Sequence, residues 1–129
     1  MAATLYHESD GKGILVNLTA TVTSKQVAYA QGWLGIVEEA GLSGDTVGMT
    51  VDEREYQWPV PDALSVNKGD LVYVDVTDLT GHTPDSSAYY VASGSNRVKL
   101  FKATAAKDTS LGSGNHFVTG KSLLHVQSL

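Results

Sequence analysis

The sequence predicts an all-β domain, either a small twisted β-sandwich or an open β-barrel, with an extended N-terminal arm. The first observation is a sequence motif that occurs twice, in which a Gly-Asp turn leads into a strand of alternating apolar and polar residues. It runs through residues 44–51 and again through residues 69–76. The second observation is the abundance of valine and threonine, which suit a pleated surface. The third is the recurrence of Gly, Pro, Asn and Asp between short apolar runs, which predicts turns.

The N-terminal arm is predicted to cover residues 1–13. This stretch is polar, ends in Gly11-Lys12-Gly13 and has no periodic apolar pattern. Leu5 and Tyr6 form an apolar pair within it, and we expect that pair to contact a neighbouring protein. The remaining residues, 14–129, are predicted to form a single β domain, since a chain of this length can bury its own core.

The first strand of the domain is expected at residues 14–21, where Ile14, Val16 and Leu18 alternate with more polar neighbours. The next segment, residues 24–40, allows two interpretations. Its apolar residues have helical spacing, yet glycines at two interior positions would each cost a helix about 1 kcal/mol. Strands at 26–30 and 33–38 are the favoured alternative, and the helix stays open.

The two Gly-Asp turns introduce the central strands. Glycine adopts a positive φ without steric cost, and the Asp side chain can bond its own backbone in a tight turn. Period-two alternation then places apolar side chains on one face of each strand: Val47, Met49 and Val51 in the first, and Val72, Val74 and Val76 in the second. An aromatic run between them, residues 53–61, contains Tyr56 and Trp58 and ends in proline.

The C-terminal half is predicted to contain shorter elements. Residues 77–87 have loop composition, residues 88–92 resemble a short strand, and residues 97–104 alternate. In that last strand Val98 and Leu100 are expected to face away from Lys99 and Phe101. The final segment, 122–129, is expected to be either a terminal strand or a tail.

Composition excludes several classes of function. The chain has 9 basic and 14 acidic residues, a net charge of −5, and no basic run, which argues against nucleic-acid binding. It has no cysteine, so disulfides and thiolate chemistry are excluded. We also expect no signal peptide and no membrane span, because the N-terminus lacks a basic region with an apolar core and no apolar run approaches about 20 residues. Synthesis in a cytoplasm is therefore predicted.

No catalytic, cofactor-binding or metal-binding residues are predicted. Residues 114–122 end in Gly-Lys-Ser like a phosphate-binding loop, but five residues separate the two glycines where that motif needs four. A turn followed by a strand is the expected structure there. Asp78, His82 and Asp85 could form a weak cation site, although a solvated loop is favoured. A Ser-His-Asp triad built from distant residues stays open.

The order of the central motifs resembles that of the decoration, or cement, proteins on the capsids of tailed bacteriophages. The resemblance covers residues 30–76, and it consists of the Gly-bounded strand 32–37, the turn Gly44-Asp45, the aromatic run to Pro61 and the turn Lys68-Gly69-Asp70 with its apolar strand. It is loose over residues 98–106 and absent from residues 78–87.

This resemblance implies a structural protein rather than an enzyme. Such a protein would stabilise the outer capsid surface by binding the major capsid protein at subunit junctions, and the resemblance implies a homo-oligomer, with a homotrimer expected. Trp33, Tyr89 and Tyr90 join Leu5 and Tyr6 as expected contact residues, because exposed aromatic side chains favour protein interfaces. The alternatives are another virion component, such as a tail, head-completion or glycan-binding module, and a small hydrolase.

Overall fold

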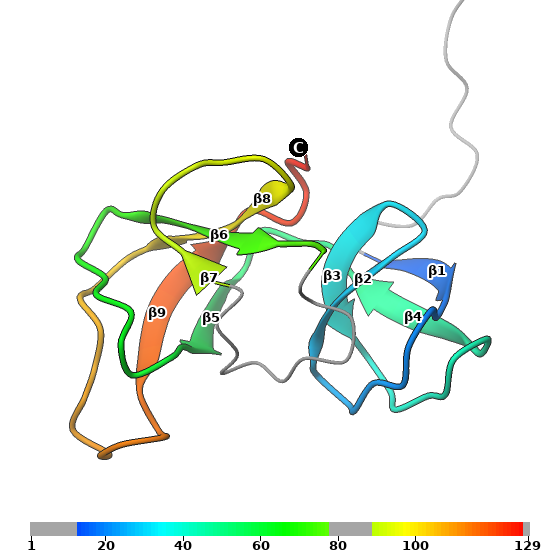
Figure 1. Ribbon diagram of the computed structural model, residues 1–129, viewed down its shortest axis with the longest axis horizontal. Helices are drawn as coiled ribbons and strands as arrows, with labels where there is room; N and C mark the ends of the chain where they lie inside the picture. The colour runs from blue at the N-terminus through cyan, green and yellow to red at the C-terminus, as the bar shows by residue number, and fades with distance from the viewer. Residues whose placement is uncertain (1–12, 78–88, 128–129) are drawn as a thin grey trace, which may run out of the picture.

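The computed structural model describes residues 13–77 and 89–127, and this part of the chain contains nine β-strands and no helix (Figure 1). Four strands form one antiparallel sheet in the order β1 (Gly13–Asn17), β4 (Thr46–Thr50), β3 (Trp33–Val37) and β2 (Val27–Ala30). Five strands form the other, in the order β5 (Glu55–Pro59), β9 (Phe117–Ser122), β8 (Arg97–Ala103), β6 (Leu71–Asp75) and β7 (Tyr89–Tyr90).

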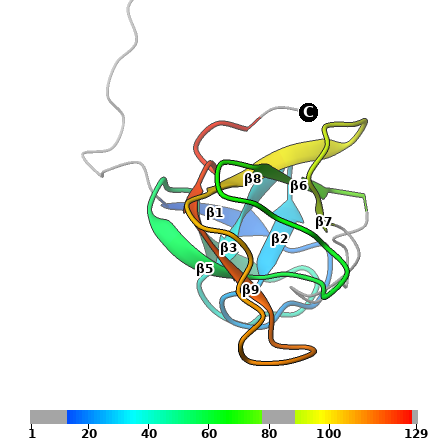
Figure 2. The ribbon, with the colours of Figure 1, turned by 90° about the vertical axis from the view of Figure 1, so that its left-hand side faces the viewer.

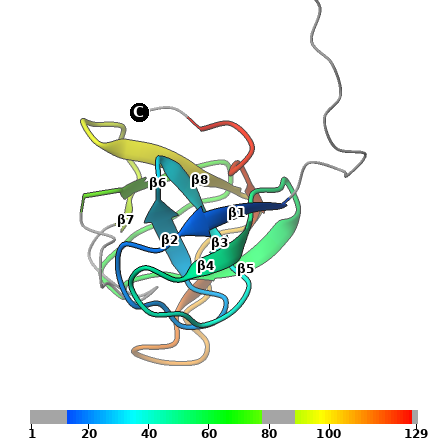
Figure 3. The same ribbon diagram turned by 90° about the vertical axis from the view of Figure 1, so that its right-hand side faces the viewer.

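The two sheets pack against each other as a small β-sandwich, and neither closes into a barrel (Figure 1). Figure 2 views the molecule from the side of the second sheet, and Figure 3 from the side of the first. Buried apolar residues from both sheets belong to one core cluster. The predicted all-β class is confirmed. The predicted arm lies outside the described residues except for Gly13, which the structure places at the start of β1.

Residues 24–40 contain strands β2 and β3 and no helix, which confirms the favoured of the two interpretations. Strands β2 and β3 make a hairpin whose two-residue turn has positive φ at both positions, 51° at Gln31 and 83° at Gly32. Turns of this kind match the right-handed twist of the flanking strands. Gly35 in β3 must be glycine for a different reason, namely close packing, since a Cβ at this position would lie 2.2 Å from Cγ of Met49.

The two Gly-Asp turns are built with the same hydrogen bonds. Gly44 and Gly69 have φ values of 93° and 91°. In the first turn the Leu42 amide donates to Oδ2 of Asp45, and in the second the Asn67 amide donates to Oδ2 of Asp70, both at 2.9 Å. Each turn also exchanges two backbone hydrogen bonds with a residue of a neighbouring segment. In the first turn the Gly44 amide donates to Leu18 O at 2.8 Å, and the Leu18 amide donates to Asp45 O at 2.8 Å. In the second turn the Gly69 amide donates to Ala103 O at 2.8 Å, and the Ala103 amide donates to Asp70 O at 2.9 Å.

The predicted core faces of the central strands are confirmed. All six expected apolar residues of β4, β6 and their extensions are buried: Val47, Met49, Val51, Val72, Val74 and Val76. In β1, Val16 is buried while Leu15 points outward and is 76% exposed. Alternation therefore places one apolar face of each strand in the core.

Strand β8 departs from the predicted alternation, because Leu100 and Phe101 are both fully buried. The pairing of β6 with β8 shifts register, so that Val72 is opposite Phe101 but Tyr73 is opposite Lys99. Leu100 is thus an extra residue in β8. Such a bulge reverses the alternation beyond it and turns Phe101 inward. The expectation that Phe101 faces away from Leu100 was wrong.

The last strand lies earlier than residues 122–129. Residues 114–122 form a turn and β9. A turn followed by a strand was predicted there, because the spacing of the two glycines does not match a phosphate-binding loop. After Ser122 the chain leaves the sheet, and it is not a loose tail: Leu124 is fully buried and the side chain of Gln127 bonds the backbone of Leu34.

Candidate functional site

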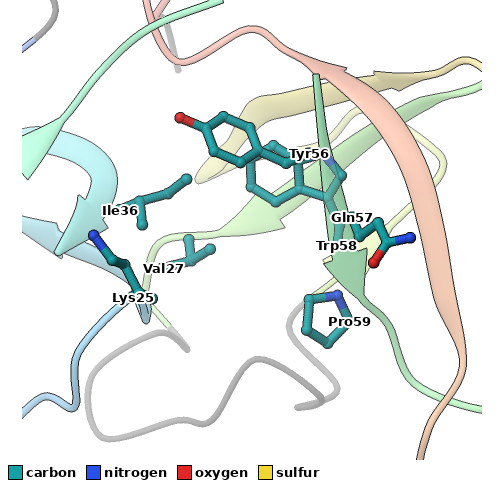
Figure 4. A pocket seen from close by; sticks show the side chains of 7 residues that line it. All are labelled: Lys25, Val27, Ile36, Tyr56, Gln57, Trp58 and Pro59. Atoms are coloured by element: carbon teal, nitrogen blue, oxygen red, sulfur yellow. The ribbon is translucent and has the colours of Figure 1, made fainter. Parts of the chain in front are cut away.

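A groove of about 210 Å³ lies where the two sheets meet (Figure 4). Its walls come from residues far apart in the sequence: Lys25, Val27 and Ile36 on the side of the first sheet, and Tyr56, Gln57, Trp58 and Pro59 of β5 on the other. Ligand pockets for drug-sized molecules usually exceed about 300 Å³, so this groove suits one apolar side chain rather than a larger ligand.

The aromatic wall of the groove is fixed from behind. Strand alternation places Tyr56 and Trp58 on the same face of β5, with ring centroids 5.2 Å apart and planes at 66°. Trp58 stacks on Phe101 at 4.9 Å and 6°, and its Nε1 donates to Gly120 O at 3.0 Å. A tryptophan held by stacking and by its polar end has little freedom to move.

The hydroxyl of Tyr56 belongs to a charged cluster at the crossing between the sheets. It donates to the carboxylate of Asp52, which also binds the guanidinium of Arg54. Burial tends to raise the pKa of Asp52, but the hydrogen bonds from Arg54 and Tyr56 and the charge of Arg54 outweigh it and lower that pKa. The same burial, together with the neighbouring carboxylate, raises the pKa of Tyr56.

Lys25 contributes the one basic group to the groove lining. Its backbone has a φ of 67°, and its amide donates to Val37 O at 2.8 Å, which holds the turn against β3. A left-handed conformation is uncommon for a residue other than glycine. Its ammonium group makes no ion pair with any described acidic residue. The lining thus combines apolar walls with one cationic side chain.

A second polar cluster joins the loop after β5 to the loop before β9. Asp62 accepts hydrogen bonds from the Ser113 hydroxyl and the Gly114 amide, and these lower its pKa. His116 Nδ1 lies 3.3 Å from Asp62 Oδ1. Here serine, aspartate and histidine do converge, but the carboxylate contacts both of the others. A catalytic triad needs the imidazole next to the serine hydroxyl, so this cluster does not have triad geometry.

The aromatic residues singled out in the sequence occupy different environments. Trp33 is 44% exposed at the start of β3. Tyr89 is buried in the core, and Tyr90 is half-buried with the guanidinium of Arg97 3.5 Å from its ring centroid. Leu5 and Tyr6 lie outside the described residues. The structure therefore leaves Trp33 as the one well-exposed member of the described three.

Sequence reasoning did not single out several exposed aliphatic residues: Leu15, Leu42, Leu111 and Val126. The exposure of Leu15 could have been predicted, because Leu15 alternates with Ile14 and Val16 and therefore lies on the face of the strand opposite to the core. For the others no sequence signal existed, since their exposure depends on how the loops pack.

The described residues contain no group of three or more His, Cys, Asp or Glu side chains placed to hold a metal ion. The loop with Asp78, His82 and Asp85 lies outside them. Within the same described ranges, no helix has the length and hydropathy to cross a membrane.

Comparison of the chain with protein-family models, curated proteins and solved structures finds no match. The fold and the groove are thus defined by the chain's own geometry: a two-sheet β domain with an apolar inter-sheet groove.

Proposed function

We propose that the chain is a structural virion protein that decorates and stabilises the outside of a tailed-phage capsid. One observation carries the proposal, namely the order of motifs from residue 32 to residue 76. The two Gly-Asp turns share the same hydrogen bonds and begin β4 and β6, and the aromatic strand β5 lies between them. This repeated pattern is the basis of the resemblance to decoration proteins.

The proposed mechanism is multivalent clamping of the shell. Each copy binds the major capsid protein at a junction of subunits, and a homotrimer would let several weak contacts act together. The acidic balance of the chain, −5 at neutral pH, suits a protein that stays soluble until it binds. The proposed location is the outer capsid surface after synthesis in the host cytoplasm.

The contact surface that we assign includes Trp33 and Val126. Both are close to half exposed, and they are the chain neighbours of Leu34 and Gln127, whose hydrogen bonds bring the C-terminal segment against β3. An exposed tryptophan is typical of a binding hot spot. Tyr89 is left out of this surface because it is buried.

Binding to bare capsids is the direct test. Purified protein mixed with expanded, undecorated capsids of the source phage should saturate at a fixed number of copies and raise the temperature at which the shells disrupt. Trp33→Ala should weaken this binding by tenfold or more, whereas Leu42→Ala, at an exposed turn on the first sheet, should not. Saturable binding that ignores Trp33 would contradict the assigned surface, and the absence of any saturation would contradict the function.

The arm supplies a second test. Deletion of residues 2–12 should leave the β domain folded but weaken capsid binding or oligomerisation at least tenfold, about 1.4 kcal/mol. Leu5→Ala with Tyr6→Ala should reproduce much of that loss. Wild-type occupancy by the truncated protein would show that the arm is dispensable. Binding to host cells or hydrolysis of an ester, peptide or glycoside substrate, without capsid binding, would favour the alternative functions.

A further inference from the structure

Within the part of the chain that the structure describes, the outer edge of the first sheet at β1 has no partner strand. Strand β1 is the last in the order β1-β4-β3-β2, and among the described strands it pairs only with β4. The Leu18 amide donates to Asp45 O on the β4 side, and alternation therefore directs the backbone groups of Leu15 and Asn17 away from β4. The Asn17 amide confirms this direction, since it donates to the side chain of Gln31 at 2.8 Å.

Gln31 covers one end of this edge and leaves the other uncovered. No described residue bonds the N–H or C=O of Leu15 on its outward side. The side chain of Leu15 is also 76% exposed, the highest value among the large apolar residues described. An edge strand with free backbone groups and an apolar side chain is a template for one more strand.

The surface beside Leu15 is hollowed because two residues there are glycines. The hollow measures about 470 Å³ and is lined by Gly13, Ile14, Leu15, Glu38 and Gly48. Gly48 lies directly opposite Leu15 across the strand pair. A side chain at Gly48 would force the Glu38 carboxylate to shift, since a Cβ there would lie 2.8 Å from Oε2.

The carboxylate of Glu38 thus lies over β4 and extends to the open edge. Its Oε1 is 3.9 Å from the place that a Cβ of Gly13 would occupy. It accepts a hydrogen bond from Thr50 Oγ1 at 3.1 Å, and it forms no ion pair with a described lysine, arginine or histidine. Among the described residues, the hollow therefore holds a carboxylate without an ion-pair partner beside an exposed apolar side chain.

We propose that the β1 edge binds an extended segment of a partner protein that carries a lysine or arginine two residues from an apolar residue. The segment adds a strand to the sheet and bonds the free N–H and C=O of Leu15. Its apolar residue packs on Leu15, and its basic residue passes over Gly13 to Glu38. Residues two apart share one face of a strand, which fixes this spacing.

Charge favours this occupant over a second copy of the chain. Of the described residues, two β1 strands paired about a twofold axis would bring Gly13, Leu15 and Asn17 to each other's edge, and none of these three carries a positive charge that could neutralise Glu38. A basic residue of the bound segment opposite Gly13 would be attracted by the Glu38 carboxylate, which stays accessible because Gly13 has no side chain. The interaction should weaken with added salt, because both charges are near the surface.

A pair of blocked synthetic peptides tests the proposal on the full-length protein. In both peptides threonine occupies the alternate positions. The first peptide carries a lysine two positions from a valine, and the second has glutamate in place of that lysine. Amide chemical shifts of residues 13–15 should respond saturably to the lysine peptide, with at least tenfold weaker binding of the glutamate peptide. Glu38→Lys should reverse the preference between the two peptides, and Leu15→Thr should weaken both.

The control is Leu111→Thr, which removes an equally apolar exposed side chain from a distant loop and should leave both affinities unchanged. Unperturbed core amide shifts will show that each variant is folded. The proposal is overturned if residues 13–15 show no saturable response, or if Glu38→Lys does not alter the preference. A Leu15-dependent dimer in sedimentation would assign the edge to a second copy instead. Tenfold tighter binding after deletion of residues 2–12 would assign it to the chain's own N-terminus.

Discussion

Gln127 bonds both backbone groups of Leu34, a residue 93 positions earlier in the chain. The Leu34 amide donates to Oε1 of Gln127 at 2.9 Å, and Nε2 of Gln127 donates to Leu34 O at 2.6 Å. Strand β4 pairs with β3 only at Ile36 and Val37, so the backbone of Leu34 lies beyond the reach of β4. The Gln127 amide takes the place of the missing strand and ties the C-terminal segment to the first sheet.

This pairing predicts that Gln127→Ala will destabilise the fold. Leu34 is fully buried, and loss of the amide leaves its N–H and C=O without partners. An unsatisfied buried polar group costs about 1–3 kcal/mol. Urea denaturation should show that loss in the free energy of unfolding, while Gln57→Ala, at an exposed position on β5, should change it by less than about 0.5 kcal/mol. Equal stability of the two variants would contradict the pairing.

The Gly-Asp turns make a second prediction. Gly44→Val and Gly69→Val should each destabilise by about 1–3 kcal/mol, because a β-branched residue is strained at a φ near 90°. No heavy atom lies within 4 Å of a Cβ at either position, so the cost comes from the backbone and not from a clash. Gly13→Ala, which meets only ordinary contacts, is the matched control. Thermal unfolding of all three variants provides the measurement, and unchanged melting of both valine variants would refute the turn assignment.

A third prediction concerns Gly120 under the ring of Phe101. A Cβ at this position would lie 2.2 Å from Cδ2 of Phe101. Gly120→Ala should therefore destabilise by about 1–3 kcal/mol, as overpacked cores do. Phe101→Leu removes the clashing ring atoms, so the double variant should be more stable than the sum of the two single changes implies, by about 0.5 kcal/mol or more. Strict additivity in chemical denaturation would show that the two residues do not clash.

The fourth prediction is an acid-dependent loss of stability through Asp52. Because the pKa of this carboxyl in the folded protein lies below its ordinary value of 3.8, the ionised form stabilises the fold above that pH. The contribution disappears as the pH falls through the lowered pKa. Asp52→Asn should thus be destabilised at neutral pH by about 1.5–3 kcal/mol, the value of hydrogen bonds to a charged group.

The difference between the Asp52→Asn variant and the wild type should shrink steadily below pH 3.8. Asp62 and Asp108 also have lowered pKa values, because hydrogen bonds from Ser113 and Ser110 favour their ionised forms, so the variant keeps part of the acid sensitivity. Glu55→Gln, at an exposed position of β5, is the control and should follow the wild-type pH profile. A constant gap between Asp52→Asn and wild type at all pH values would exclude the proposed role.

Local pattern was enough to predict most of the strands. Period-two alternation identified β4 and β6 and the faces they bury, because the backbone of a strand alone decides which way successive side chains point. The turns at Gly44 and Gly69 were equally predictable, since positive φ is a property of a single residue. The aromatic strand β5 followed from its alternation and its terminal proline.

The tertiary structure alone decided what those local patterns could not encode. The bulge at Leu100 depends on the pairing of β8 with β6, and it buries Phe101 against the predicted phase. The burial of Tyr89 and the bond of Gln127 to Leu34 likewise need a partner from another segment. The inter-sheet groove has the same origin, because its walls at Val27 and Trp58 meet only once the two sheets have packed. Sequence fixes the direction of a side chain along its own strand, whereas the contact it makes depends on which distant segment arrives beside it.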